Sequence, residues 1–312
     1  MTKATQIAVN PPRPRFPPLN ALRALEAAVR HESFAKAADE LGVTPAAVSH
    51  QIKALEQWLG TPIFVRHAQG LHLTDSARAA LPALSGAFDA LGHAVRELRS
   101  RSPNTQLNIA ALPSIAQLWL APQLPALRRA FPELQLSVHA LETPPNLNRE
   151  PFDLAIFFLR EAQRGARAFK VCDDALFPVC APALAATLRT PADLAAYPQL
   201  WDTAWKDDWA AWFAAAGVTG VPVNHGPGFS LYSLALQAAL EGEGVLIAHE
   251  ALTAAAIRAG SLIAPFPVRA TTGTRLEILV PERQPAETLR IVDWLLAECS
   301  QPAIARTGAA QL

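Results

Sequence analysis

The side chains with the clearest chemical potential lie on one face of a short predicted helix, residues 44–57 of the 312-residue chain. The residues on that face are Pro45, Ala46, Ser49, His50 and Lys53. Hydroxyl, imidazole and ammonium groups on an exposed helix are suited to hydrogen bonds with base edges and phosphates. The chemistry that these residues indicate is therefore recognition of nucleic acid.

Motifs for catalysis and metal binding are missing from the sequence, which contains no GxSxG, no HExxH and no P-loop. Gly242 and Gly244 lie between a predicted helix and a predicted strand, the wrong order for a dinucleotide-binding loop. The eight histidines are scattered, and Cys172, Cys180 and Cys299 lack the spacing of metal ligands. We therefore predict no enzyme activity, no metal and no cofactor.

Two short helices and a sharp turn are expected to position the polar face. Ser33 caps the first helix and Gly42 ends it, while Thr44 caps the second and Pro45 suits its first position. The buried stripe of the second helix has spacings of four and three: Val48, Ile52 and Leu55. Such a pair is a helix-turn-helix, whose second helix fits the DNA major groove. Spacing alone leaves an ordinary helical hairpin in a core as an alternative.

The flanking segments predict a complete winged domain. A helix capped by Asn20 and ending at His31 precedes the pair. Its inward-facing residues are expected to be Leu22, Leu25 and Val29. Residues 62–73 predict two strands joined by a turn, which is a wing. Arg66 on the wing and Thr74 at the next helix start are placed to hold phosphates, contacts that position a protein on DNA without reading sequence.

Residues 74–99 have the pattern of one long helix. Its apolar residues follow the spacing of a coiled-coil seam: Leu81, Leu84, Phe88, Leu91, Val95 and Leu98. The seam favours dimerisation, with packing of the helix on its own domain as the alternative. Pro82 lies inside the helix and is expected to bend or break it, because proline removes a backbone hydrogen bond.

The charge distribution agrees with DNA binding by the amino-terminal part. The whole chain has 27 basic and 27 acidic residues; residues 1–102 contain 12 and 8 of these, or +4, which leaves 15 and 19, or −4, for the remainder. Phosphate binding requires an excess of this kind. With no run of 18 uncharged apolar residues and no apolar signal-peptide core, the protein is expected in the cytoplasm, without membrane contact.

The Pro-rich residues 1–18 are expected to form a disordered or extended arm. A loose tail is favoured over a DNA-binding arm, since its basic residues are few: Lys3, Arg13 and Arg15. From about residue 104, short apolar strands alternate with amphipathic helices, which indicates an α/β domain with a mixed sheet. The strands are predicted at 107–112, 134–140, 153–158, 176–180, 244–248 and 276–280, and the helices at 115–130, 208–216, 230–240 and around 289–296.

Residues 19–99 resemble the winged helix-turn-helix and linker helix of LysR-type transcriptional regulators, closest to the subgroup with the glycine-cleavage activator and the β-lactamase regulator. The resemblance rests on LNALRALEAAVRHESFAKAADELGVTPAAVSHQIKALEQWLGTPIFVR and GLHLT, followed in order by FDLAIFF, LFPVC, FSLYSLALQAAL and EGEGVLIA. It implies DNA contacts from Ser33, Thr44, Pro45, Ala46, Ser49, His50, Lys53, Arg66 and Thr74. Pro45 replaces the usual Gln and His50 a frequent Arg. Proline cannot hydrogen-bond a base, so base recognition should shift to Ala46, Ser49, His50 and Lys53.

The resemblance also implies an α/β fold with an all-α amino-terminal domain, a dimerising linker helix and a two-part effector domain like a periplasmic solute-binding protein. The expected boundaries are 1–18 for the arm, 19–73 for the DNA-binding domain, 74–102 for the linker helix, 103–303 for the effector domain and 304–312 for a tail. Half I of the effector domain is about 103–180 and 266–303, and half II about 181–265, with crossovers near Ala181 and residues 265–268.

A small-molecule co-inducer, with a carboxylate, is expected between the halves, where strand ends and helix N-termini favour anions. By resemblance the segments opened by Ser114 and Ser230 line this cleft, although plain helix capping by both serines is an open alternative. The other candidates are Thr143, Phe158, Asp202, Tyr232 and His249. An aromatic cage formed by Trp201, Trp205, Trp209 and Trp212 is disfavoured, because the last three share helical spacing and are expected in the core.

Cys172 and Cys180 invite comparison with the peroxide sensors of the same family, but Cys180 lies in an apolar strand, which disfavours a redox role. The predicted function is an effector-responsive regulator of transcription that binds double-stranded DNA as a homodimer or homotetramer, with RNA polymerase as a further candidate partner. The competing class is a solute-binding or enzymatic α/β protein with an accessory helical domain.

Overall fold

The computed structural model describes residues 16–67, 70–100, 106–163, 167–282 and 284–300. Most of the predicted arm and all of the predicted tail lie outside the described residues. The chain forms two compact units, which divide between Ala94 and Val95.

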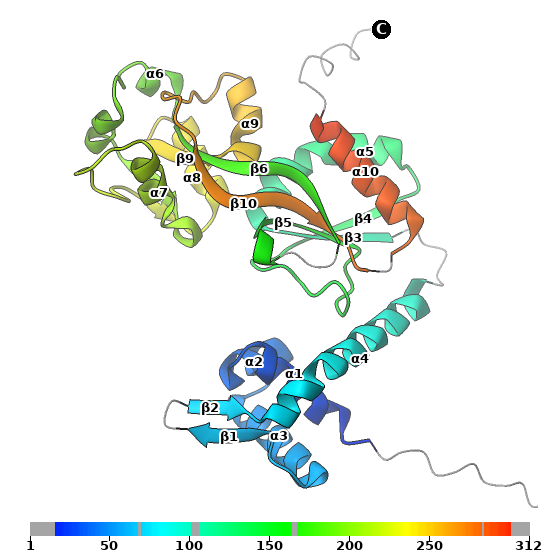
Figure 1. The fold of residues 1–312 in the computed structure, drawn as a ribbon. Helices are drawn as coiled ribbons and strands as arrows, with labels where there is room; N and C mark the ends of the chain where they lie inside the picture. Colours follow the sequence, from blue (N-terminus) through cyan, green and yellow to red (C-terminus); the bar gives the residue numbers. More distant parts are fainter. Residues whose placement is uncertain (1–15, 68–69, 101–105, 164–166, 283, 301–312) are drawn as a thin grey trace, which may run out of the picture. The chain divides into compact units, whose positions relative to one another are not determined.

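The amino-terminal unit is a winged helix-turn-helix with a long helix after the wing. Its elements in chain order are α1 (Leu19–Arg30), α2 (Phe34–Leu41), α3 (Pro45–Leu59), β1 (Phe64–His67), β2 (Gly70–Leu73) and α4 (Asp75–Ser100) (Figure 1). The two strands pair antiparallel, with Phe64 opposite Leu73. The architecture predicted from the sequence is confirmed.

The turn between α2 and α3 is built by the expected capping residues. The Ser33 hydroxyl accepts a hydrogen bond from the Lys36 backbone N–H at 3.3 Å, and Thr44 accepts one from Ala47 at 3.2 Å. Gly42 ends α2 in the left-handed conformation, with φ of 65°. Side chains larger than glycine are strained there, so this position fixes the sharp turn.

One expectation for α1 is wrong. The helix follows Pro18 at its cap position, and no side chain caps it, so Asn20 lies inside the helix. The predicted Leu22 and Leu25 pack against the core but are only partly buried, as is Val29, and the fully buried residues are mainly alanines, Ala21, Ala24, Ala27 and Ala28. Methyl side chains allow the three helices to pack at short distances.

The break expected at Pro82 does not occur, because α4 continues through this residue, while the alternative of a bend stays a prediction. The Pro82 side chain is exposed, so the loss of one backbone hydrogen bond does not uncover core residues. The turns on both sides keep their own hydrogen bonds, and a 26-residue helix tolerates this single loss.

The carboxy-terminal unit is an α/β domain. Its first part contains β3 (Gln106–Ala111), η1 (Ile115–Leu120), η2 (Ala121–Gln123), α5 (Leu124–Ala130), β4 (Gln135–Ala140), β5 (Leu154–Arg160), η3 (Glu161–Gln163) and β6 (Ala168–Val179). Its second part contains α6 (Pro182–Ala185), η4 (Pro191–Ala196), β7 (Gln199–Asp202), η5 (Thr203–Trp205), α7 (Asp208–Ala215), β8 (Gly228–Phe229), α8 (Tyr232–Leu240), β9 (Val245–His249), α9 (Glu250–Arg258), β10 (Ala270–Leu279) and α10 (Ala286–Ser300).

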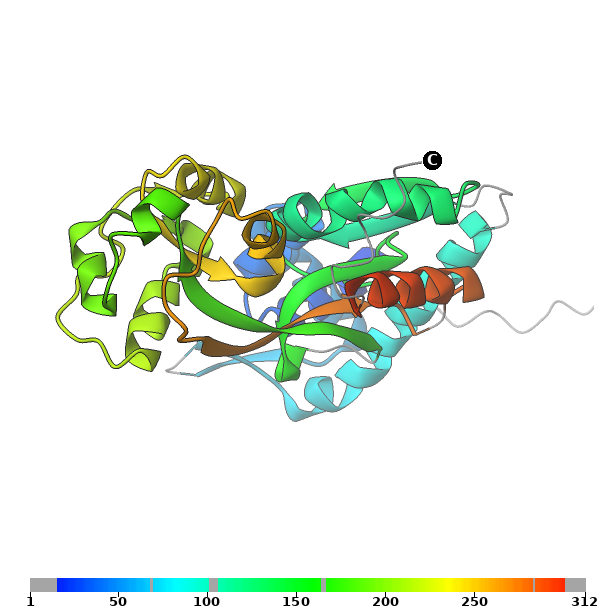
Figure 2. The ribbon, with the colours of Figure 1, turned by 90° about the horizontal axis from the view of Figure 1, so that it is seen from above.

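One mixed sheet runs through this unit in the strand order β4-β3-β5-β10-β6-β9-β7-β8. The parallel strands β4, β3 and β5 form half I, and the parallel strands β8, β7 and β9 form half II. Between them, β6 and β10 pair antiparallel and run from one half to the other (Figures 1 and 2). This is the two-part α/β fold that the sequence predicts.

Helices α5 and α10 lie side by side on half I (Figures 1 and 2). The ring of Phe131, at the end of α5, meets the ring of Trp294 on α10 edge to face, with centroids 6.5 Å apart. Ile109, Ile156 and Val292 are fully buried in the core that these elements enclose. These contacts pack the two helices against the sheet of half I.

Several local predictions for this unit need correction. The helix expected over 115–130 is three consecutive pieces, a π-helix, a 3₁₀ turn and α5, because Pro122 and Pro125 each remove a backbone donor. The strands β6 and β10 begin at Ala168 and Ala270, well before the predicted 176 and 276, since polar residues interrupt their apolar pattern. Helix α9 is an element that the sequence pattern does not predict.

Candidate functional site

The exposed face of α3 contains the residues that the sequence selects for DNA contact. Thr44, Pro45, Ala46, His50 and Lys53 are exposed and Ser49 is half-buried. On the opposite face Val48, Ile52 and Leu55 are at most 3% exposed and fix the helix to α1 and α2. The helix therefore presents one polar face on a rigid support, which is the geometry needed to enter a major groove.

The wing is attached to α3 by a carboxylate that the sequence did not single out. Glu56 accepts hydrogen bonds from the backbone N–H groups of Ile63 and Phe64, at 2.8 and 3.2 Å. Both bonds satisfy donors at the start of β1, so they set where the wing begins relative to the helix. An acid near the end of a helix, opposed by the helix dipole, is the sequence signal for such a role.

The predicted phosphate-binding residues have defined local contacts. The Thr74 hydroxyl accepts from the Ala77 N–H and donates to the Pro62 carbonyl, both at 3.4 Å, so Thr74 caps α4. Ser33 caps α2, as described above. Arg66 lies on β1 opposite Leu71, and its side chain is outside the described residues. Contact of these residues with DNA remains a prediction.

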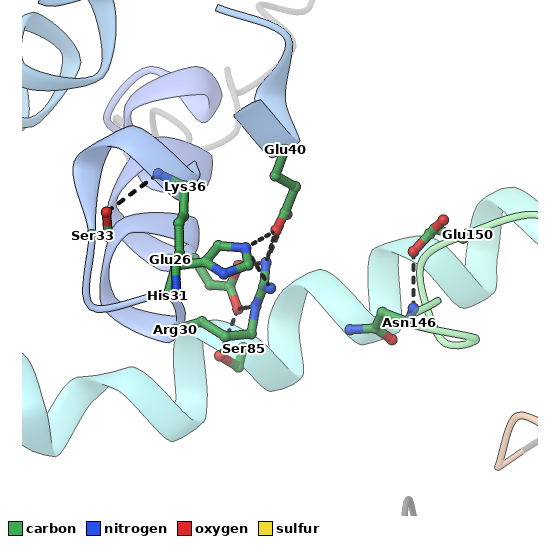
Figure 3. A network of polar contacts seen from close by, with 9 residues as sticks. All are labelled: Glu26, Arg30, His31, Ser33, Lys36, Glu40, Ser85, Asn146 and Glu150. Carbon is green, nitrogen blue, oxygen red and sulfur yellow. Dashed lines mark hydrogen bonds and ion pairs between the residues drawn. The ribbon is translucent and has the colours of Figure 1, made fainter. Parts of the chain in front are cut away.

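A network of charges connects α1 with α2 and α4 (Figure 3). Arg30 donates to both oxygens of Glu40, at 2.6 and 2.8 Å, and to Glu26 at 3.3 Å. The Ser85 hydroxyl on α4 donates to the buried Glu26 at 3.2 Å. Burial alone raises the pKa of Glu40, but the bonds from Arg30 and His31 outweigh it and lower that pKa. The network sets the direction in which α4 leaves the three helices.

The apolar side chains of the seam on α4 become more exposed toward the end of the helix. Leu81, Leu84 and Phe88 are half-buried. Beyond them Leu91, Val95 and Leu98 are 47, 41 and 74% exposed. Large apolar side chains repeated at this spacing are expected to be covered in the functional protein.

The two serines expected at helix starts do not cap helices. Ser114 has helical backbone angles and no capping bond, and its hydroxyl, 6% exposed as a residue, has no hydrogen-bond partner in the described part of the chain. Ser230 is exposed and lies two residues before α8, whose cap position is Leu231. The capping alternative is therefore wrong for both, and an unpaired buried hydroxyl at Ser114 calls for a partner. Thr143 is exposed in the loop after β4.

His249, at the end of β9, joins two carboxylates from distant parts of the chain. Its Nδ1 lies 2.9 Å from Asp174 on β6, and its Nε2 lies 3.1 Å from Asp208 on α7. Burial alone lowers the pKa of His249, but the hydrogen bonds to Asp174 and Asp208 raise it to about 9. At neutral pH the ring is thus an imidazolium that donates to both acids.

Tyr232 supports this histidine from α8. Its hydroxyl donates to the Ile247 carbonyl at 2.9 Å and accepts from the His249 N–H at 3.2 Å. Burial raises the pKa of Tyr232. The hydroxyl is fully engaged, so Tyr232 forms the wall of a site and holds β9 against α8.

Trp205 brings the aromatic candidates together, although the sequence assigned it to the core. It lies in the 3₁₀ turn η5, before α7 begins at Asp208, and is only half-buried. Its ring centroid is 4.0 Å from that of His249, 5.3 Å from Tyr232 and 6.0 Å from Phe158. Since Phe158 belongs to half I, the ring of Trp205 contacts side chains of both halves. Trp209 and Trp212 are buried as expected.

Asp202 ends β7 and lines a small cavity next to Trp205. One oxygen of its carboxylate accepts from the Ala204 N–H at 2.7 Å. Burial raises the pKa of Asp202, and the charge of Glu142 adds to this effect. The cavity is lined by Leu200, Trp201, Asp202, Trp205, Asp208, Trp209, Tyr232, Leu246 and Ile247. Of the seven predicted effector residues, Phe158, Asp202, Tyr232 and His249 therefore gather around Trp205, which the sequence did not select.

The described residues give little support for redox chemistry, metal binding or a membrane-spanning helix. Burial raises the pKa of the Cys180 thiol to about 11, so the reactive thiolate is disfavoured there. Within the described ranges, no group of three or more His, Cys, Asp or Glu residues is arranged to hold a metal ion. No helix of the described residues has the length and apolar character to cross a membrane.

Comparison with known protein families finds a matching profile for each of the two units. Residues 19–78 match the profile "Bacterial regulatory helix-turn-helix protein, lysR family", and residues 100–300 match "LysR substrate binding domain". The chain is 39% identical over 255 residues to the glycine cleavage system transcriptional activator of Escherichia coli K12, covering 81% of this chain and 83% of that protein. It is 38% identical over 269 residues to the transcriptional activator AmpR of Rhodobacter capsulatus, covering 86 and 92%.

Solved structures agree with these matches. The effector domain of the regulator AmpR of Pseudomonas aeruginosa has a TM-score of 0.53 and 28% identity, covering 62% of this chain and 95% of that chain. The LysR-type regulator CrgA of Neisseria meningitidis covers 90% of this chain and 99% of its own, with a TM-score of 0.50 and 20% identity, which supports the fold alone.

Proposed function

The chain belongs to the LysR family of transcriptional regulators, and from this premise we propose how its residues bind DNA, a second copy of the chain and an effector. It is a DNA-binding regulator with an effector-binding domain and not an enzyme. Regulators of this family bind DNA and small molecules and form oligomers. The assignments below concern this chain's own residues.

We propose that α3 reads the operator through Ala46, Ser49, His50 and Lys53, with Thr44 and Pro45 at the groove edge and Ser33, Arg66 and Thr74 at phosphates. The observation that carries this proposal is the polar, exposed face of α3 opposite its buried stripe. Pro45 and His50 leave few side-chain donors, so backbone contacts and DNA shape should carry much of the specificity.

Gel shifts at several salt concentrations, on DNA upstream of the protein's own gene, test this assignment. Lys53→Ala should weaken operator binding and reduce the slope of log affinity against log salt by about one for each phosphate that the lysine neutralises. Ser49→Ala should weaken binding to the operator more than to unrelated DNA. Arg128→Ala, an exposed arginine of the effector domain, is the matched control. Unchanged affinity in both α3 variants would remove α3 from the interface.

The same experiment separates the competing class. A solute-binding or enzymatic α/β protein with an accessory helical domain would show no specific, salt-dependent shift on this DNA. Specific binding by the unaltered protein supports the regulator.

We propose that the protein is a homodimer or homotetramer paired through α4, because Leu91, Val95 and Leu98 expose a continuous apolar seam. Pairing doubles the DNA contacts, which a charge excess of only +4 per amino-terminal part requires. Sedimentation of Leu91→Lys should reveal monomers, while Leu234→Lys, at an exposed leucine of α8, should not change the assembly. Identical assembly of Leu91→Lys and the unaltered protein would contradict the pairing.

We propose that the effector binds between the two halves, against Ser114, Thr143, Phe158, Asp202 and Ser230, with Tyr232 and His249 supporting the wall. The unpaired buried hydroxyl of Ser114 supports a polar ligand contact in half I. By binding one arrangement of the halves better than another, the effector shifts the population of DNA-binding states. Ser114→Leu should abolish the effector response of operator binding and leave basal DNA affinity intact.

Two further assignments follow from DNA as the target. The protein acts in the cytoplasm, where the chromosome of a bacterium lies. The named relatives are transcriptional activators, so RNA polymerase is proposed as a partner at the promoter. Reporter transcription in the presence and absence of the gene tests activation.

A further inference from the structure

The cavity beside Trp205 has an unusual combination of residues. Its lining contains two carboxylates, Asp202 and Asp208, and four aromatic rings, Trp201, Trp205, Trp209 and Tyr232. No lysine or arginine belongs to this lining. A cavity with this composition repels anions and offers electron-rich ring faces to a cation.

Asp202 has an unfilled hydrogen-bonding position at this cavity. The residue is only 8% exposed, and its Oδ1 accepts from the Ala204 N–H at 2.7 Å. No group of the described residues donates to its Oδ2. Oδ2 is not among the fully enclosed unpaired atoms of the described residues, so a donor from solvent can reach it.

Burial raises the pKa of Asp202 and the positive charge of His249 acts to lower it, but both ring nitrogens of His249 are already bonded to Asp174 and Asp208. One imidazolium thus faces two carboxylates, and Oδ1 of Asp174 has no partner in the described part of the chain. Glu142, from the loop after β4, adds a further negative charge that acts on Asp202. Carboxylates therefore outnumber cationic groups around this cavity.

We propose that the effector of this protein carries a protonated amine, which enters the cavity, donates to Asp202 and packs against the rings of Trp205 and Trp201. This inference rests on the proposed effector site and names the chemical class of its ligand. On this proposal the carboxylate expected from the sequence does not bind in this cavity, because Asp202 and Asp208 line it and the charge of Glu142 acts on Asp202. A ligand with both groups must place its carboxylate elsewhere in the cleft.

A matched set of three small probes tests the charge preference: propylammonium, 1-propanol and propionate. Each is titrated into the full-length protein at constant ionic strength, and the tryptophan indole N–H resonances report binding. Propylammonium should shift the Trp205 and Trp201 resonances at a concentration about tenfold lower than 1-propanol, the effect expected of one charged hydrogen bond. Propionate should leave them unchanged. The Trp205→Phe variant assigns its resonance.

Three variants make the test specific. Asp202→Asn should remove the preference for propylammonium over 1-propanol, and Asp202→Glu should retain it because the charge is kept. Asp207→Asn is the control, since Asp207 is an exposed acid one residue before α7 and makes no capping bond. Retention of the preference in Asp202→Asn, or equal binding of the three probes by the unaltered protein, would overturn the inference.

Operator gel shifts on the same samples distinguish a failure of this inference from a failure of the proposed function. If propylammonium is not preferred but the protein shifts its operator with the expected salt dependence, only the ligand class is wrong. If the protein does not bind operator DNA, the proposed function fails whatever the probes do.

Discussion

The two units of this protein place their functional polar groups in opposite environments. On α3 the candidate DNA contacts are exposed, and the core beneath them consists of alanines, Val48, Ile52 and Leu55. In the effector domain Asp174, Asp202 and His249 are buried and bonded to one another or to the backbone. Recognition by the first unit is thus separable from folding, whereas in the second unit the site is part of the core.

The largest loss of stability is expected for His249→Ala, which tests whether the site of the effector domain is part of its core. The substitution leaves Asp174 and Asp208 without their shared cation, and the loss of one partner from a buried ion pair costs about 3–5 kcal/mol. Urea unfolding followed by tryptophan fluorescence reports mainly on the effector domain, which contains every tryptophan except Trp58. An unfolding free energy within about 1 kcal/mol of the unaltered protein's would show that the cluster is not part of the core.

The free energy of unfolding in the same urea experiment should also depend on pH, with a change slightly smaller than that caused by His249→Ala. His249 has a folded pKa of about 9, raised from 6.5, so its contribution is fully present below pH 6.5. As pH rises from 6.5 to 9 the unfolded state loses this proton first, and stability should fall by about 3 kcal/mol.

The groups facing His249 are Asp174, Asp208, Tyr232, Trp205 and Phe158. Burial raises the pKa of Tyr232, which keeps its proton throughout this range. The decline should therefore be absent in His249→Gln. The same decline in that variant would assign it to another group.

In the amino-terminal unit, Thr44→Ala should have a smaller effect on stability. It removes the hydroxyl that accepts from the Ala47 N–H, and loss of such a cap costs about 1 kcal/mol. Thermal unfolding measured by circular dichroism should show a lower transition temperature for the amino-terminal unit, with the effector-domain transition unchanged. Thr44→Ser keeps the acceptor and should restore most of the loss.

The smallest stability change is expected for Lys53→Ala, although its effect on DNA affinity is large. The side chain is exposed on α3, on the face opposite the buried stripe, so the free energy of unfolding should change by less than about 0.5 kcal/mol. Chemical unfolding and gel shifts on one preparation measure both quantities. A large loss of stability would show that recognition and folding are coupled in this unit as well.

The difference between the units also explains which features were predictable. Ser33, Gly42, Thr44 and the stripe on α3 act within a few residues of their own positions, so periodicity and capping rules located them. Asp174 and His249 are 75 positions apart and meet only when β6 pairs with β9. No local pattern contains that contact, and the sequence therefore selected His249 without its partners.

The predictions from the sequence that the structure corrects have similar causes. Asn20 has the chemistry of a cap, but the chain enters α1 from Pro18. Trp205 shares helical spacing with Trp209 and Trp212, but α7 begins only at Asp208, so Trp205 lies before the helix, is only partly buried against the core and lines the cavity. Tertiary packing overrides local propensity in both places.

The paired strands β6 and β10 have a mechanical consequence. They carry the only two passages of the described chain between the halves, so any closure of one half on the other must flex this two-stranded beam. Its ladder is interrupted between Thr271 and Arg275, where Gly273 has a φ of 70°. The Thr274 hydroxyl at this interruption lies 3.4 Å from Asp174. The break in the pairing of the two connecting strands thus lies next to the charge cluster around His249, so bending of the strands at this point would be felt by that cluster.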